Sequence, residues 1–359
     1  MLIYPTLKLS PLQGMAGMGG GVVNRSTMGA GGVPGGGLYS FTTFTFTSAS
    51  TSGNTGPSLS SLQSAYSGAA FLSSYFTSSN GIQLWTAPKD GTYEIELRGA
   101  SGGGNTTGSY FPADPGQGAK IVTRVSLTKS TQYSLVVGQT PGGSSSDNGS
   151  AGGGGSWMYT GSIGGNGLIA VAGGGGGWGH GTSSGTGGNG LGGNASQASR
   201  RVSSGANVSG KTGNGTGTNN GTGYGGGLST TGDYGGASGG AGWLSDGSDR
   251  TSGNTSTGGH SAGSGASTAW LGGTGGNSAL NGGFGGGGGS NGSGHAGGGG
   301  GGYTGGPAGN DWNNQTWGNG GGGGSYYTGS LQASSDGAHG GSHTQAQATN
   351  GYIKITFIS

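Results

Sequence analysis

The chain has 359 residues, of which 103 are glycine, and hydrophobic residues make up only 28% of it. Charged residues amount to 6% with a formal net charge of +2, so the charge balance favours neither nucleic acid nor an anionic membrane as a partner. Glycine does not recur at every third position, which excludes collagen. Cysteine is absent, so the chain forms no disulfide. No apolar run is long enough to span a membrane, and the start of the sequence does not resemble a signal peptide.

Residues 1–40 form an arm that contains glycine and methionine, with neither a period-2 nor a period-3.6 pattern of apolar residues. Its most distinctive stretch runs from Pro11 to Gly21. We expect this arm to dock onto a partner protein, and a frayed terminus is the alternative.

Residues 41–172 contain the patterns expected of a β sandwich. Phenylalanines alternate with threonines around Phe44, and a clear in/out alternation runs from Tyr93 to Arg98. We expect strands at residues 41–46, 82–86, 93–98, 121–125, 133–137, 157–159 and 168–171, and a final strand within 351–359 that returns to the same sheet. Short strands bounded by turn residues predict an all-β sandwich or jelly roll.

One short helix is expected near residues 57–66. Pro57 suits an early helical position, and Gly68 follows where a helix should stop. Leu59, Leu62 and Tyr66 fall on one helical face. The helix would lie between the first two expected strands.

Residues 173–350 contain almost no strand or helix pattern, and glycine is concentrated in runs such as 173–177, 285–289 and 297–302. Such a region is either unstructured or held by its own backbone groups. In an extended helix of three residues per turn, N–H and C=O groups point outward, and glycine lets neighbouring helices approach until these groups bond. Ordering costs about 1–2 kcal/mol per residue while a hydrogen bond returns about 0.5–1.5, so only a bundle with nearly every group bonded would be stable.

Three stretches resemble a known family in their order as well as their composition. They are 168–172 leading into 173–178, 282–284 leading through two glycine runs to 303–306, and 85–97 leading into 98–103. They are similar to the glycine-rich extracellular region of the anaplastic lymphoma kinase and leukocyte tyrosine kinase receptors. The resemblance covers roughly residues 80–359 and implies a tumour-necrosis-factor-like β sandwich with an inserted bundle of polyglycine II helices. The chain lacks the receptors' cysteines, membrane helix and kinase, so receptor signalling is not implied.

A second resemblance concerns the segment from Gly56 to Thr86, which looks like one that precedes such domains in structural proteins of marine tailed phages. Tail-fibre adhesins of T-even-type phages resemble the chain in architecture. This implies a place on the virion surface or tail. The arm would bind other virion proteins, and the glycine region would present loops to a host glycan or outer-membrane protein. A homotrimer is compatible with this resemblance.

Several motifs suggest chemistry that the rest of the sequence does not support. Residues 205–212 match the P-loop pattern, but no strand precedes them and no helix follows, so we expect neither nucleotide nor any other cofactor. Asp246, Asp249 and Arg250 lie in one polar stretch that we interpret as a turn network rather than an acid/base pair. The histidines are too dispersed to predict a metal site: His180, His260, His295, His339 and His343. The sequence therefore does not predict an enzyme.

Aromatic residues among the glycine runs are the candidate receptor contacts, because Trp and Tyr combine flat apolar faces with a polar edge. The candidates are Trp243, Tyr303, Trp312, Trp317, Tyr326 and Tyr327. The alternative is that these side chains cap the glycine bundle. Two other functions stay open, namely a purely architectural capsid-decoration or fibre-collar protein, and a secreted matrix or ice-binding protein. The latter would be expected to show a signal peptide and a flat Thr/Ala face, and the sequence shows neither.

Overall fold

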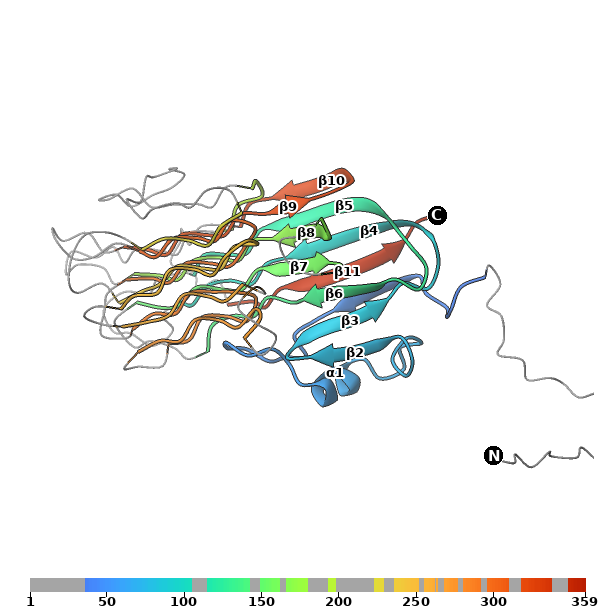
Figure 1. Ribbon diagram of the computed structural model, residues 1–359, viewed down its shortest axis with the longest axis horizontal. Helices are drawn as coiled ribbons and strands as arrows, with labels where there is room; N and C mark the ends of the chain where they lie inside the picture. Colours follow the sequence, from blue (N-terminus) through green and yellow to red (C-terminus); the bar gives the residue numbers. More distant parts are fainter. Residues whose placement is uncertain are drawn as a thin grey trace, which may run out of the picture.

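Two antiparallel sheets packed face to face, with extended glycine segments running on from one end, make up the computed structural model (Figure 1). The structure describes residues 36–104, 115–142, 149–161, 166–179, 193–197, 223–228, 236–251, 255–261, 263, 268–276, 280–291, 296–309, 318–337 and 348–359. Most of the arm, the P-loop-like motif, Trp312 and Trp317 lie outside the described residues.

The two sheets contain eleven described strands, and all neighbouring strands are antiparallel. The five-stranded sheet has the order β1-β11-β4-β5-β10, formed by β1 (Thr43–Phe46), β4 (Gly91–Arg98), β5 (Lys120–Leu127), β10 (Ser330–Ser335) and β11 (Tyr352–Phe357). The six-stranded sheet has the order β2-β3-β6-β7-β8-β9, formed by β2 (Phe76–Ser79), β3 (Ile82–Thr86), β6 (Gln132–Val136), β7 (Ser156–Tyr159), β8 (Leu168–Ala172) and β9 (Tyr326–Tyr327). The all-β prediction is confirmed at this level.

The main core lies between the two sheets. Strand β4 shows the period-2 rule directly, because Tyr93, Ile95 and Leu97 are fully buried while Glu94 and Glu96 face outward. The facing sheet contributes Trp85 and Leu135, among others. Full burial of an Ile or Leu side chain stabilises the fold by roughly 1.5–3 kcal/mol. This half of the molecule is therefore an ordinary side-chain core.

The predicted helix is α1, which spans Leu59–Ala65. It begins after Ser58, whose hydroxyl accepts from the Ser61 amide at 3.1 Å, so Ser58 is the N-cap and Pro57 precedes it. Leu62 and Tyr66 are buried in the main core as predicted, whereas Leu59 is 36% exposed and does not reach it.

Three strands were not expected from the sequence. Strand β2 pairs with β3, and β9 and β10 form the outer strands of the two sheets, close to the C-terminal end of the glycine-rich sequence. Strand β10 is exposed along its whole length and contains three serines in six residues, so it shows no apolar alternation. Because neither of its faces is covered, the strand buries no side chain and needs no apolar alternation.

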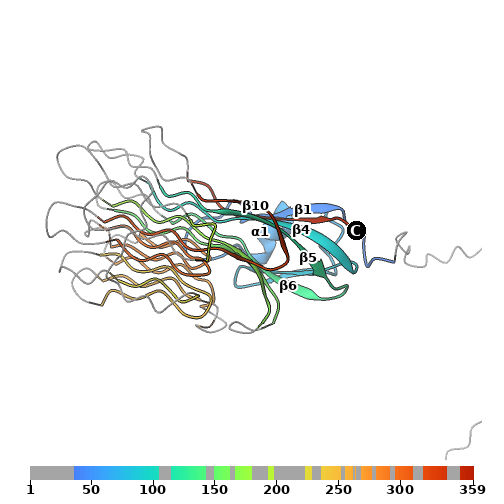
Figure 2. The same ribbon diagram turned by 90° about the horizontal axis from the view of Figure 1, so that it is seen from above.

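Strands of both sheets continue into glycine segments at the same end of the sandwich (Figures 1 and 2). Residues 99–104 follow β4, residues 115–119 precede β5, and residues 149–155 precede β7. We call these segments the glycine block, together with 138–142, 173–179, 223–228, 236–251, 255–261, 268–276, 280–291, 296–309, 318–325 and 348–351. The block thus includes residues before 173, which the sequence analysis placed with the sandwich strands.

The hydrogen bonds of the run 173–177 follow a three-residue repeat. The amides of Gly174 and Gly177 donate to one neighbouring segment, while their carbonyls accept from a second. The bonds are Gly174 N to Gly301 O (2.7 Å), Gly177 N to Gly298 O (2.9 Å), Gly323 N to Gly174 O (2.9 Å) and Gly320 N to Gly177 O (2.8 Å). A third segment also bonds to this run. The Ala119 amide donates to Gly173 O, and the Gly116 amide donates to Gly176 O. Partners on three sides differ from the two sides available to a β-strand.

Candidate functional site

An aromatic cluster joins the glycine block to the outer face of the six-stranded sheet. The sheet contributes Trp157 and Tyr159 from β7, and the block contributes Trp270 and Phe284. The rings of Trp157 and Trp270 have centroids 4.1 Å apart, and the Trp270 indole donates to the Tyr159 hydroxyl at 3.1 Å. Trp157 in turn donates to the carbonyl of Gly285 at 3.3 Å. We call these residues and Trp243 the docking cluster.

Trp243 differs from the expectation that it contacts a receptor. It is only 4% exposed, and its ring lies 5.5 Å from Tyr159 and 6.3 Å from Trp157, measured between centroids. Its polar sequence neighbours suggest an exposed loop, but its partners come from β7, far away in the sequence. Trp243 therefore closes the docking cluster and is too buried to serve as a contact residue.

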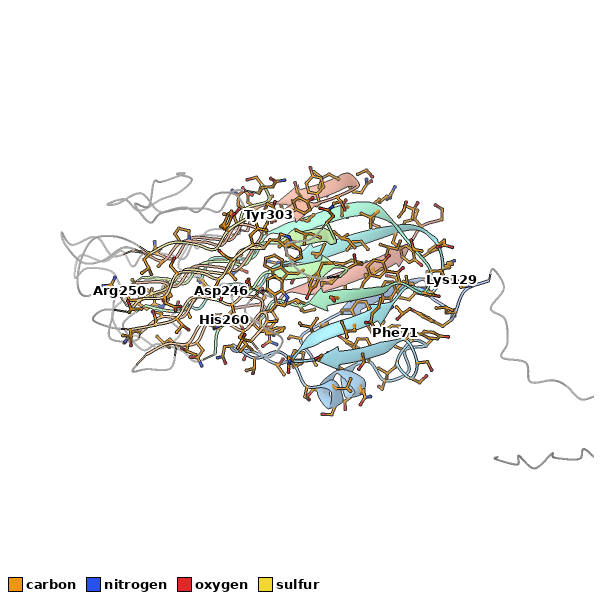
Figure 3. The ribbon with its side chains drawn as sticks, in the orientation of Figure 1. Phe71, Lys129, Asp246, Arg250, His260 and Tyr303 are labelled. Carbon is orange, nitrogen blue, oxygen red and sulfur yellow. The ribbon has the colours of Figure 1, made fainter. Side chains whose placement is uncertain are left out.

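Tyr303 and Tyr326 form a stacked pair at the edge of the docking cluster. Their ring centroids are 4.7 Å apart with an interplanar angle of 25°. Both side chains are half-buried, and burial raises the pKa of Tyr303, with neighbouring Tyr326 adding to the effect. Figure 3 places Tyr303 where the glycine block meets β9.

Two exposed side chains extend this pair over the surface of the glycine block. Tyr224 is 38% exposed and Leu244 is 44% exposed. Gly223 lies against Leu244 and Tyr303, because a Cβ at that position would be 3.3 Å from Leu244 Cδ1 and 3.6 Å from the ring of Tyr303. Tyr224 follows Gly223 directly, and its carbonyl accepts from the Gly305 amide at 2.9 Å. We call Tyr224, Leu244, Tyr303 and Tyr326 the tyrosine patch.

Backbone hydrogen bonds hold the segments of the tyrosine patch together. The Leu244 amide donates to Gly223 O at 2.8 Å, and the Gly223 amide donates to the buried Thr304 hydroxyl at 2.9 Å. The Tyr303 carbonyl accepts from the Trp243 amide at 3.0 Å. The surface is therefore organised before any ligand arrives.

Tyr327 faces away from this surface although it follows Tyr326 directly. Tyr326 is paired with Val171, which belongs to the docking cluster side of the sheet, whereas Tyr327 is paired with Ala170, which faces the main core. Successive strand residues point to opposite faces. Tyr327 is 37% exposed and remains a candidate contact, but on a different face.

A polar network lies within the glycine block around Asp246 and His260, both labelled in Figure 3. One Asp246 oxygen accepts from both the amide and the hydroxyl of Ser261 at 2.7 Å, and Asp249 accepts from the Gly258 amide at 2.8 Å. The other Asp246 oxygen lies 3.5 Å from His260 Nδ1, and this interaction raises the pKa of His260. The carboxylates serve as acceptors for backbone amides, and Ser261 bonds to the aspartate rather than to the histidine. The arrangement is the expected turn network and not a nucleophile–base pair.

Comparison with known proteins gave no matching family model and no matching curated protein. Within the residues that the structure describes, no three His, Cys, Asp or Glu side chains gather as metal ligands would. The same part of the chain contains no helix with the length and apolar character needed to span a bilayer.

The described candidates divide between the interior and the surface. Trp243 is interior, while Tyr303, Tyr326 and Tyr327 reach the surface, and Trp312 and Trp317 lie outside the described residues. Tyr224 and Leu244 were not among the candidates. Their sequence neighbours resemble those of many other positions here, and only their placement beside Tyr303 distinguishes them.

Proposed function

We propose that the chain is a non-enzymatic protein of a phage virion surface or tail tip, and that it acts as an adhesin for a host-cell receptor. In this proposal the sandwich is of the tumour-necrosis-factor-like jelly-roll type, and the glycine block is a bundle of polyglycine II helices. The block serves as a rigid scaffold that presents a binding surface. The observation that carries the proposal is the backbone hydrogen bonding of the block, because it explains how a glycine-rich chain is rigid enough for presentation.

The three-residue repeat supports polyglycine II helices in particular. Such a helix has three residues per turn, so residues three apart face the same neighbour. The amides of Gly174 and Gly177 donate to one neighbouring segment in this way, and the carbonyls of Gly173 and Gly176 accept from another. A β-strand would instead repeat every two residues.

The placement of the chain ends supports attachment at the end of the sandwich that lies away from the glycine block. Gly36, the first described residue, is held by the Lys129 ammonium, and the Leu38 amide donates to Pro88 O at 2.8 Å. The C-terminal residue Ser359 accepts from the Thr92 amide in the same region. Figures 1 and 2 show this end of the sandwich opposite the glycine block. An arm preceding Gly36 would therefore meet the virion on the side away from the block.

The exposed tyrosine patch favours the adhesin over a purely architectural capsid or collar protein. An architectural protein needs no exposed aromatic surface, whereas a contiguous exposed apolar patch commonly marks a contact site. Tyr224 and Leu244 are both more than a third exposed.

The test is adsorption of the purified, fluorescently labelled protein to bacterial cells. Saturable binding that competes with phage adsorption is the expected result. Assembly onto virions without any cell binding would overturn the adhesin and favour the architectural role. Thermal hysteresis of the purified protein would instead point to ice binding.

Amide hydrogen exchange tests the scaffold independently of the receptor. We expect the amides of Gly174, Gly175 and Gly177 to be protected to an extent comparable with those of β4, since each bonds to a neighbouring carbonyl. Exchange as fast as in a denatured peptide would contradict a rigid block.

A further inference from the structure

The tyrosine patch has the composition of a surface that stacks against a flat, partly apolar ligand. Tyr303 and Tyr326 are stacked on one another. Leu244 and Tyr224 are exposed, on segments whose backbone lies against the Tyr303 segment. Nothing among the described residues hydrogen-bonds to the phenolic hydroxyls of Tyr224, Tyr303 or Tyr326. A tyrosine offers an apolar ring and a hydroxyl that both donates and accepts.

The described segments that form the patch are uncharged. None of the residues in the segments 223–228, 242–245, 302–306 and 324–328 is Asp, Glu, Lys, Arg or His. The nearest acidic residue in sequence is Asp246, whose carboxylate is bonded to Ser261 and lies beside His260. Within these described segments a charged ligand would find no countercharge, so electrostatic complementarity favours a neutral one.

The patch is also small. A stable protein–protein interface uses about 20–30 residues from each partner. Four side chains on a backbone-bonded surface are too few for that, but they match the size of one or two sugar rings. The C–H faces of a pyranose are apolar and its edge carries hydroxyls, as the tyrosines require.

We infer that the tyrosine patch binds neutral pyranose rings of a host-surface glycan by stacking, with the phenolic hydroxyls bonding to the sugar hydroxyls. This rests on the proposed adhesin function and specifies its ligand class and its site. The ordinary pKa of tyrosine is about 10 and burial raises that of Tyr303 further, so this phenol is protonated and can donate at neutral pH. The site lies at the junction of block and sandwich.

The test uses the full chain on an array of neutral and acidic oligosaccharides, followed by titration calorimetry with the tightest neutral binder. We expect neutral hexose oligosaccharides to bind with an affinity that hardly changes with salt, since no charge takes part. Tyr224→Ala and Tyr303→Ala should each weaken binding about tenfold or more. Tyr327→Ala is the matched control, because Tyr327 is equally exposed on the other face of β9 and should leave the affinity unchanged.

Tyr303 also packs against the docking cluster, so its variant could fail to fold; Tyr224→Ala, at a more exposed position, then decides. Binding confined to acidic glycans, no binding to any neutral glycan, or a loss caused equally by Tyr327→Ala would each overturn the inference. Cell adsorption separates this from the proposed function. If wild type and Tyr224→Ala adsorb equally, the patch is not the site but the adhesin stands, whereas a wild type that does not adsorb removes the adhesin itself.

Discussion

The sandwich is held by side chains that meet between its two sheets, whereas the glycine block is held by main-chain hydrogen bonds. In the sandwich, residues such as Ile95 and Leu97 are fully buried and each stabilises the fold by roughly 1.5–3 kcal/mol. In the block, each hydrogen bond returns about 0.5–1.5 kcal/mol against an ordering cost of about 1–2 kcal/mol per residue. The block on its own is therefore marginal.

The docking cluster supplies part of the side-chain burial that the glycine block lacks. Trp157, Trp270 and Phe284 are fully buried between the block and the six-stranded sheet, and they add the apolar burial that the glycines cannot provide. A region with almost no side-chain core can therefore be ordered under two conditions. Its backbone must be hydrogen-bonded to neighbouring segments, and it must pack against a domain that has an ordinary core.

The largest expected effect comes from removing the link between the two regions. Trp270→Ala should lower the free energy of unfolding by about 3–5 kcal/mol, because it leaves a cavity beside Trp157 and removes the bond to Tyr159. The block should then unfold before the sandwich, giving two transitions in calorimetry. Trp85→Ala, within the sandwich core, is the control and should lower stability similarly without separating the transitions. A single unchanged transition for Trp270→Ala would mean that the block does not depend on docking.

A smaller effect should follow from adding one methyl group inside the block. A Cβ on Gly176 would clash with the backbone carbonyl of Gly320, so Gly176→Ala should cost about 1–3 kcal/mol or more by forcing backbone segments apart. Gly263→Ala is the matched control, because its nearest neighbour would be the Ser261 hydroxyl oxygen at an ordinary 3.5 Å. That variant should stay within about 0.5 kcal/mol of wild type in urea unfolding. Equal effects of the two substitutions would rule out close backbone packing at Gly176.

The smallest effect concerns pH. The pKa of His260 is raised above its ordinary value of about 6.5 by Asp246, so protonated histidine favours the folded state. This contribution is fully present below the unfolded pKa and is lost as pH rises through the higher folded pKa. It should stay below about 1 kcal/mol, because the Asp246 side chain is 42% exposed and water screens the pair.

Urea unfolding at about pH 5.5 and about pH 8.5 measures this contribution. The wild type should be more stable relative to His260→Gln at the lower pH, and the two should converge at the higher pH. A gap that widens as the pH rises would contradict the direction of the shift.

Much of the sandwich could be predicted because its strands are short and periodic. The expected strand at residues 82–86 is β3 itself, and the alternation from Tyr93 to Arg98 lies within β4. Strand β9 could not be predicted because it has only two residues, and β10 could not because it is exposed along its whole length and shows no apolar alternation. The extension of strands into glycine segments before residue 173 was also missed, since glycine itself carries no pattern.

The candidate site was predictable only in part. Tyr303 and Tyr326 were candidates for their amphipathic side chains, and the structure brings them together although 22 residues separate them. The burial of Trp243 and the exposure of Leu244 could not be predicted, because sequence neighbours do not show which of two adjacent apolar side chains points inward. The structure answers this through Trp157 and Tyr159, which contact Trp243 from a distant strand.

The direct continuation of β4, β5, β7, β8, β9 and β11 into glycine segments has a mechanical consequence. A pull applied at the outer end of the block travels along covalent backbone into the sheets without crossing a flexible tether. The lateral hydrogen bonds of neighbouring segments lie across that pull and are loaded in shear, many at a time, instead of being unzipped singly. Such a molecule would resist drag as one stiff body.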